Sequence, residues 1–139
     1  MTTQPQTYNV TVLMSMQELL AAFLGTECHF KMILDDVANT LSLRELELRL
    51  ELVRQSAQHF EEAESLIEQA QKASEYLLNI YQRRRLDDEW IVEPEERQHI
   101  AKVFRLAEFI QIQLSRRENM QALSRAKEVL SNKALFGIV

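Results

Sequence analysis

The stretch that decides the fold is Leu41–Arg85, LSLRELELRLELVRQSAQHFEEAESLIEQAQKASEYLLNIYQRRR. It contains no glycine and no proline, and nearly all of its residues favour a helix. A capping-box pattern, Ser42-x-x-Glu45, marks its start, because these two side chains can satisfy each other's free backbone N–H groups. The sequence therefore predicts one continuous helix over residues 42–86, roughly 65 Å long at the helical rise per residue.

The apolar residues of this stretch follow the spacing of a coiled coil, in steps that alternate between three and four. Their register slips near Glu64, which we interpret as a local change of supercoil within a single helix. The resulting apolar seam consists of Leu43, Leu46, Leu50, Val53, Ala57 and Phe60 before the slip and Ala63, Leu66, Ile67, Ala70, Ala73, Leu77 and Ile80 after it.

Two more helices are expected, one on each side of the long helix. The pattern Ser15-x-x-Glu18 predicts the start of a helix over about residues 15–40. Gly25 leaves open whether this segment is one kinked helix or two short ones. On the other side, Pro94 suits the first position of a helix that runs over about residues 94–132.

These elements predict an all-α fold. We expect an elongated antiparallel hairpin of two long helices, packed by a shorter N-terminal helical segment in a coiled-coil-like bundle. Residues 1–14 are expected to form a flexible arm and residues 15–139 a single helical domain. Because the first segment is too short to cover both long helices, part of the apolar seam would stay exposed, and we expect a homodimer.

Composition limits the class of protein further. The net charge of −5 argues against nucleic acid as the first choice of partner and favours solubility. The single cysteine, Cys28, cannot form an internal disulfide, which suits a reducing compartment. No basic region precedes the apolar window Val10–Gly25, and that window is too short to span a bilayer. We therefore expect a cytoplasmic protein.

Candidate catalytic and metal sites are weak. Glu96-x-x-His99 matches half of a di-iron ligand pattern, but the second copy that such a site requires is missing, so we expect a surface pair. Cys28 and His29 are adjacent and would point about 100° apart on a helix, which suits a nucleophile and its base poorly. Cys28 is instead expected to be semi-buried. We predict no enzyme activity, no cofactor and no metal site.

Two arginine clusters are candidate binding residues. Arg83, Arg84 and Arg85 end the long helix, where the helix dipole favours cations, and this structural role is one interpretation. Contact with phosphate groups is the other, and it applies equally to Arg116 and Arg117.

Aromatic and apolar residues at the predicted helix ends are further candidates for partner binding. Trp90 and Ile91 lie in the link between the two long helices, where a large aromatic either anchors a partner or plugs the end of the bundle. Phe136 lies in the apolar C-terminal tail, which either docks onto the first helix or contacts a partner.

The function that these patterns favour is non-enzymatic protein binding, as a helical chaperone, adaptor or inhibitor of a larger partner. The alternative is a nucleic-acid-associated regulatory protein that uses the arginine clusters. Retention on DNA that weakens steeply with salt would distinguish the alternative from the first interpretation.

Overall fold

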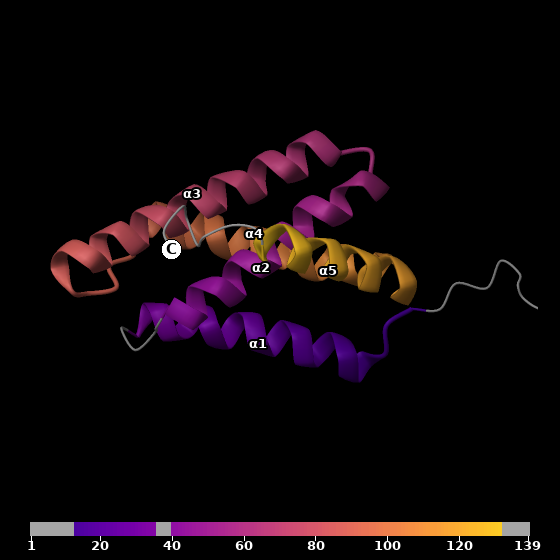
Figure 1. The fold of residues 1–139 in the computed structure, drawn as a ribbon, viewed down its shortest axis with the longest axis horizontal. Helices are drawn as coiled ribbons and strands as arrows, with labels where there is room; N and C mark the ends of the chain where they lie inside the picture. Colours follow the sequence, from indigo (N-terminus) through magenta and orange to yellow (C-terminus); the bar gives the residue numbers. More distant parts are fainter. Residues whose placement is uncertain (1–12, 36–39, 132–139) are drawn as a thin grey trace, which may run out of the picture.

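The computed structural model describes residues 13–35 and 40–131 of the chain (Figure 1). Those residues form α-helices, one short 3₁₀ helix and an isolated antiparallel bridge between Leu13 and Ser115, which confirms the all-α class. The expected flexible arm lies almost entirely outside the described residues, as does the C-terminal tail. The elements are α1 (Met16–Leu34), α2 (Thr40–Ser56), η1 (Ala57–His59), α3 (Ala63–Asp87), α4 (Pro94–Gln113) and α5 (Arg116–Ser131).

The single helix predicted over residues 42–86 is wrong, because the chain breaks between α2 and α3. After η1, Phe60 has extended backbone angles, and α3 then turns back to pack against α2. The slipped seam near Glu64 marks this break rather than a change of supercoil. Once the chain reverses direction, the seams of α2 and α3 both face one core.

The single helix predicted over residues 94–132 is also interrupted. α4 ends at Leu114, whose backbone is extended, and α5 begins two residues later. Ser115 and Glu118 form a capping box there: the Ser115 N–H donates to Glu118 Oε1 at 2.9 Å, and the Glu118 N–H donates to Ser115 Oγ at 3.0 Å. Each bond satisfies a backbone donor that the start of α5 would leave unpaired.

The two capping boxes predicted from the sequence have different outcomes. Ser15 caps α1, with its N–H 3.0 Å from Glu18 Oε1 and its Oγ 3.1 Å from the Glu18 N–H, as predicted. α1 then runs unbroken through Gly25, which settles the choice between one helix and two. Ser42 is not the N-cap of α2, because the helix begins at Thr40 and Ser42 is a buried residue of its first turn.

The link between α3 and α4 lies where it was predicted. Asp88 ends α3 in the left-handed conformation, with φ of 60°, and its N–H donates to the Arg84 carbonyl at 2.9 Å. Pro94 is the first residue of α4, and the Glu93 N–H just before it donates to Glu96 Oε1 at 2.9 Å. α3 and α4 pack against each other as a short hairpin within the larger bundle, rather than as two long arms.

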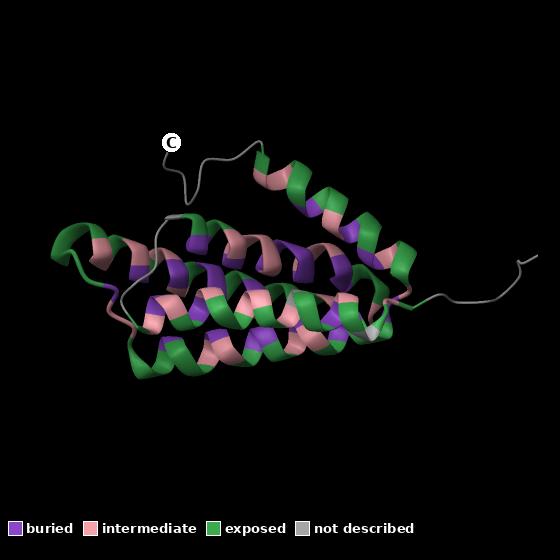
Figure 2. Cartoon of the chain, turned by 90° about the horizontal axis from the view of Figure 1, so that it is seen from below, coloured by how far each residue is buried: buried purple, intermediate pink, exposed green. Residues whose placement is uncertain are grey.

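The apolar core is assembled around α2, which contacts α1, α3, α4 and α5 (Figure 1). Figure 2 shows the buried residues on the inward faces of the helices. Most of the predicted seam is therefore covered within one chain, and among its described residues on α2, η1 and α3 Ile67 stays exposed. The long exposed seam on which the homodimer was predicted is thus not found in these helices. The homodimer itself stays a prediction. The buried seam residues of α2, η1 and α3 are Leu43, Leu46, Leu50, Val53, Ala57, Leu66, Ala70, Ala73, Leu77 and Ile80.

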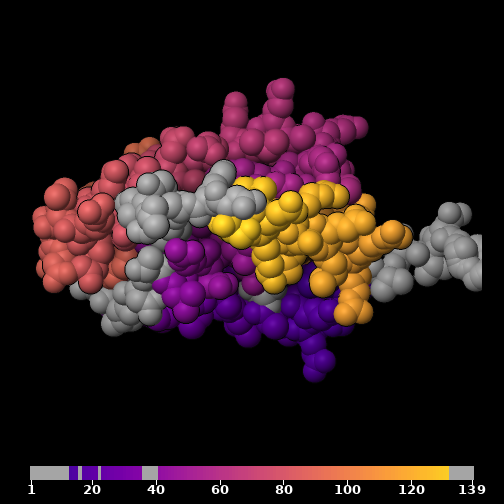
Figure 3. Space-filling model, in the orientation of Figure 1, coloured from indigo at the N-terminus to yellow at the C-terminus, as the bar shows by residue number. Residues whose placement is uncertain are grey.

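α5 packs on α2 through small side chains. Ala122 and Ala126 are fully buried and lie one helical turn apart, so they allow the two backbones to approach closely. Figures 1 and 3 show α5 (yellow) crossing the front of the molecule, and Figure 2 shows it tilted away from the other helices. Most of its remaining residues are exposed.

Candidate functional site

The first arginine cluster mainly stabilises the α3–α4 end of the bundle. Arg83 donates to the Ile91 carbonyl at 2.9 Å and forms an ion pair with the carboxylate of Glu96. Arg84 pairs with Asp88, and its guanidinium carbon lies 5.5 Å from the centre of the Trp90 ring. Arg85 is exposed.

Trp90 plugs the end of the bundle, which is one of the two roles considered for it. Its side chain is only 7% exposed and belongs to the main core cluster. Ile91 is half-buried beside it. A role for these residues in partner recognition stays a prediction.

The second arginine cluster lies at the other end of the molecule, at the start of α5 (Figure 1). Arg116 pairs with Glu18 of α1 at 3.1 Å, while Arg117 is exposed. The structure therefore does not combine the two clusters into one basic surface. Phe136, the remaining candidate, lies outside the described residues.

The residues of the weak metal and catalytic patterns have structural surroundings. Glu96 is buried, so the expected surface pair with His99 is wrong. One ring nitrogen of His99 lies 3.0 Å from the Gln69 carbonyl, and its ring packs edge-on against Tyr76. Cys28 is exposed rather than semi-buried. Over the described ranges, no group of His, Cys, Asp and Glu side chains has the geometry to hold a metal ion.

A buried charged network joins α2 to α3. Arg54 contacts Glu51 at 2.9 Å and Glu47 at 3.6 Å, and Ser74 of α3 donates to Glu47 at 2.9 Å. Burial raises the pKa of Glu47, and the opposing effect of Arg54 is smaller. Arg54 pairs with both carboxylates, although Glu47 Oε2 and Arg54 Nε lack a hydrogen-bond partner among the described residues. Because the contacts join α2 to α3, we assign the network to the fold rather than to binding.

Four exposed apolar residues lie on α1 and α4, which are in contact. Leu20 and Leu24 on α1 are 48% and 62% exposed, and Phe109 and Ile112 on α4 are 57% and 50% exposed. We call these four residues the α1/α4 surface. Sequence reasoning did not single out this surface.

Two contacts fix how these residues lie relative to one another. The rings of Phe30, near the end of α1, and Phe104, in the middle of α4, pack edge-on with centres 5.9 Å apart. The bridge between Leu13 and Ser115 joins the residues before α1 to those after α4. The two helices therefore run antiparallel. Leu20 and Leu24 therefore lie across from the last turns of α4, which carry Phe109 and Ile112.

Two carboxylates adjoin the α1/α4 surface. Glu27 lies one turn after Leu24, and Glu108 lies one turn before Ile112. Burial raises the pKa of Glu108, the nearby charge of Glu27 raises it further, and Arg105 lowers it in part. Two like charges close together make this site favourable for a cation.

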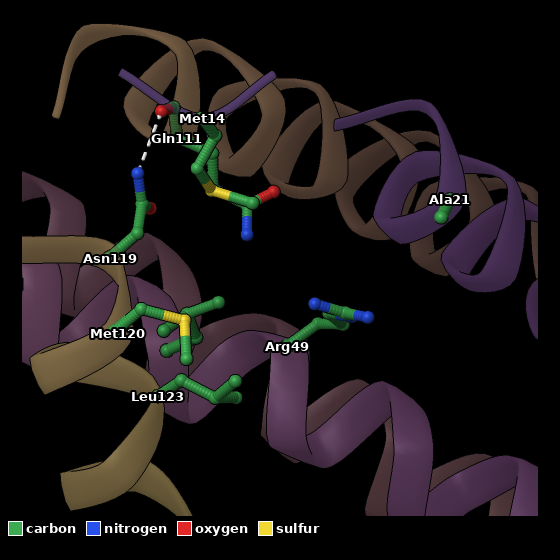
Figure 4. Close-up of a pocket in the computed structure, with 8 residues that line it drawn as sticks. Met14, Ala21, Arg49, Gln111, Asn119, Met120 and Leu123 are labelled. Atoms are coloured by element: carbon green, nitrogen blue, oxygen red, sulfur yellow. Dashed lines mark hydrogen bonds between the residues drawn. The ribbon is translucent and has the colours of Figure 1, made fainter. Parts of the chain in front are cut away.

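A cavity of about 280 Å³ lies among α1, α2, α4 and α5, and none of the four residues of the α1/α4 surface lines it (Figure 4). Arg49 of α2 projects into it opposite Met120 and Leu123 of α5. Asn119 and Met14 lie across the same space. Sequence reasoning gave no hint of this cavity, because its walls come from segments far apart in the chain.

Comparisons with known proteins do not supply a relative. No family model, no curated protein and no solved structure matches the chain. Among the described residues, no helix is both long and apolar enough to cross a membrane.

Proposed function

We propose that this chain is a non-enzymatic helical module that binds another protein through the α1/α4 surface. One observation supports this proposal most strongly: four large apolar side chains, each about half exposed or more, lie at matching heights on two contacting antiparallel helices. A monomeric protein rarely leaves such a cluster exposed unless it serves an interaction. Chaperone, adaptor and inhibitor are the roles open to such a module.

The chemistry of the surface favours an amphipathic, basic helix as the partner segment. An apolar strip between two helices suits a helix that presents apolar side chains at three- and four-residue spacing. Glu27 and Glu108 would then pair with Lys or Arg side chains along the edge of that helix, which would relieve the repulsion between the two carboxylates.

A second copy of the chain is a poorer occupant of the same surface. In a symmetric dimer the same patch meets itself, so two copies of Glu27 and two of Glu108 would be brought together. This repulsion opposes the homodimer predicted from the sequence. The nucleic-acid alternative gains little support, since Arg83, Arg84 and Arg116 all form ion pairs within the bundle.

The proposal is tested with a labelled model peptide that forms a helix with Leu on one face and Lys along the flanks. A matched peptide carries Glu in place of each Lys. Fluorescence anisotropy should show saturable binding of the basic peptide and at least about tenfold weaker binding of the acidic one.

Variants locate the binding site. The double substitution Leu24→Ser and Phe109→Ser should weaken binding of the basic peptide by about tenfold or more, because it removes apolar contact area at the centre of the surface. Leu86→Ser is the matched control, since Leu86 is 84% exposed on α3 and lies outside this surface. Equal weakening in both variants, or no effect in either, would refute the proposal.

A further inference from the structure

We infer that the cavity around Arg49 is a second binding site, separate from the α1/α4 surface, and that it takes a small hydrophobic carboxylate. Its location between four helices is typical of ligand sites in helical bundles. At about 280 Å³ it is near the lower end of the size range of such sites, which limits the ligand to a small molecule.

The cation in this cavity is the first observation. Arg49 is half-buried and forms no ion pair with the described residues. Burial lowers the pKa of its guanidinium, and the charge of Glu45 on the same helix opposes this in part. A partly desolvated guanidinium gains from an anionic partner in direct contact. A ligand carboxylate would supply that partner, since the two groups can form two parallel hydrogen bonds.

The buried amide of Asn119 is the second observation. Its Nδ2 donates to backbone carbonyls of Gln111 at 3.0 Å, Ser115 at 3.2 Å and Leu114 at 3.3 Å, which fixes the orientation of the side chain. Its Oδ1 is buried and accepts no hydrogen bond from the protein. Because this oxygen is closed off from solvent, Asn119 forms a fixed, preformed part of the cavity wall rather than a hydrogen-bond partner for a ligand.

Apart from Gln111, the remaining walls are apolar, which determines the rest of the ligand. Met14, Leu52, Met120 and Leu123 line the space together with Ala21. Methionine side chains are flexible and adapt to irregular apolar shapes. A simple inorganic anion would use Arg49 but leave these walls in contact with water, so an acid with a hydrocarbon body fits the cavity better.

Decanoate and decanol, measured by isothermal titration calorimetry below the concentration at which decanoate forms micelles, provide the test. The two probes share a hydrocarbon chain and differ in the carboxylate. We expect saturable binding of decanoate and at least about tenfold weaker binding of decanol. Equal affinity of the two, or no saturable binding of decanoate, would overturn the inference.

The Arg49→Gln variant tests whether Arg49 is the cation that binds the carboxylate. It should weaken decanoate by about tenfold or more and leave decanol nearly unchanged, whereas Arg44→Gln, at an exposed position on the same helix, should leave both unchanged. Circular dichroism would show whether the variants are folded. If Arg49→Gln does not fold, the comparison of decanoate with decanol on the unchanged protein still tests whether the site requires a carboxylate. Equal decanoate binding by folded Arg49→Gln would refute the site.

Discussion

Gly25 occupies an interior position of α1 where its lack of a side chain has no visible use. Its backbone is helical, and a Cβ atom added there would meet no atom within 4 Å. Glycine in a helix costs roughly 0.5–1 kcal/mol relative to alanine, because the unfolded chain loses more freedom on folding. The residue weakens α1 without shaping it.

Replacing Gly25 should therefore stabilise the protein. Gly25→Ala is expected to raise the free energy of unfolding by about 0.5–1 kcal/mol, measured by urea denaturation. The reverse change at an exposed site one turn earlier, Ala21→Gly, should lower it by a similar amount. A loss of stability in Gly25→Ala would show that α1 is not a straight helix at this point.

Glu47 predicts a pH dependence of stability. Its folded pKa is raised above the ordinary value of 4.5, mainly by burial, so the native state binds its proton more tightly than the unfolded state does. The stability that this difference contributes is present below the unfolded pKa and is lost as the pH rises through the higher folded pKa.

Glu47→Gln removes this titration and keeps an acceptor for Ser74. Denaturation midpoints of the two proteins, compared from pH 3 to 8, should diverge in favour of the glutamine variant as the pH rises above about 4.5. If the glutamine variant instead became less stable than the unchanged protein as the pH rises, Arg54 would stabilise the carboxylate more than burial destabilises it.

At the scale of elements, the start of α5 depends on one serine. Ser115→Ala removes the side chain that accepts the Glu118 N–H, and we expect a loss of about 0.5–2 kcal/mol in urea denaturation. Ser124→Ala, at an exposed position inside α5, should change stability by less than about 0.5 kcal/mol. Equal effects at both positions would argue that α4 continues directly into α5.

The α3–α4 link makes a second prediction at this scale. Because Trp90 is buried at the end of the bundle, Trp90→Ala should cost about 3–5 kcal/mol of stability. Leu86→Ala, in the same region but 84% exposed, should have little effect. If Trp90→Ala melted like the unchanged protein, the indole would be available to a partner, and the burial described for it would be wrong.

Local signals account for the elements that were predicted well. The capping box at Ser15, the proline at position 94 and the scarcity of glycine are features of neighbouring residues, and they correctly indicated helices and one link. The break at Ser115 was also readable, because it repeats the Ser15 pattern. It was missed because one long helix was expected over residues 94–132.

The break between α2 and α3 could not be read in the same way. No glycine or proline marks residues 57–62, and the local propensities favour a continuous helix. The chain reverses because the seams of α2 and α3 bury each other, and such long-range burial outweighs propensity. The cavity around Arg49 has the same origin, since its walls come from four helices and no short segment contains its pattern.

At the scale of the whole molecule, a single chain buries most of its own apolar seams and leaves only limited surfaces for partners. Sedimentation velocity at micromolar concentration tests this most directly, because it reports mass and shape together. We predict a compact particle of about 16.3 kDa, the mass of one chain. An elongated particle of twice that mass would contradict the account and support the dimer of long hairpins that the sequence suggested.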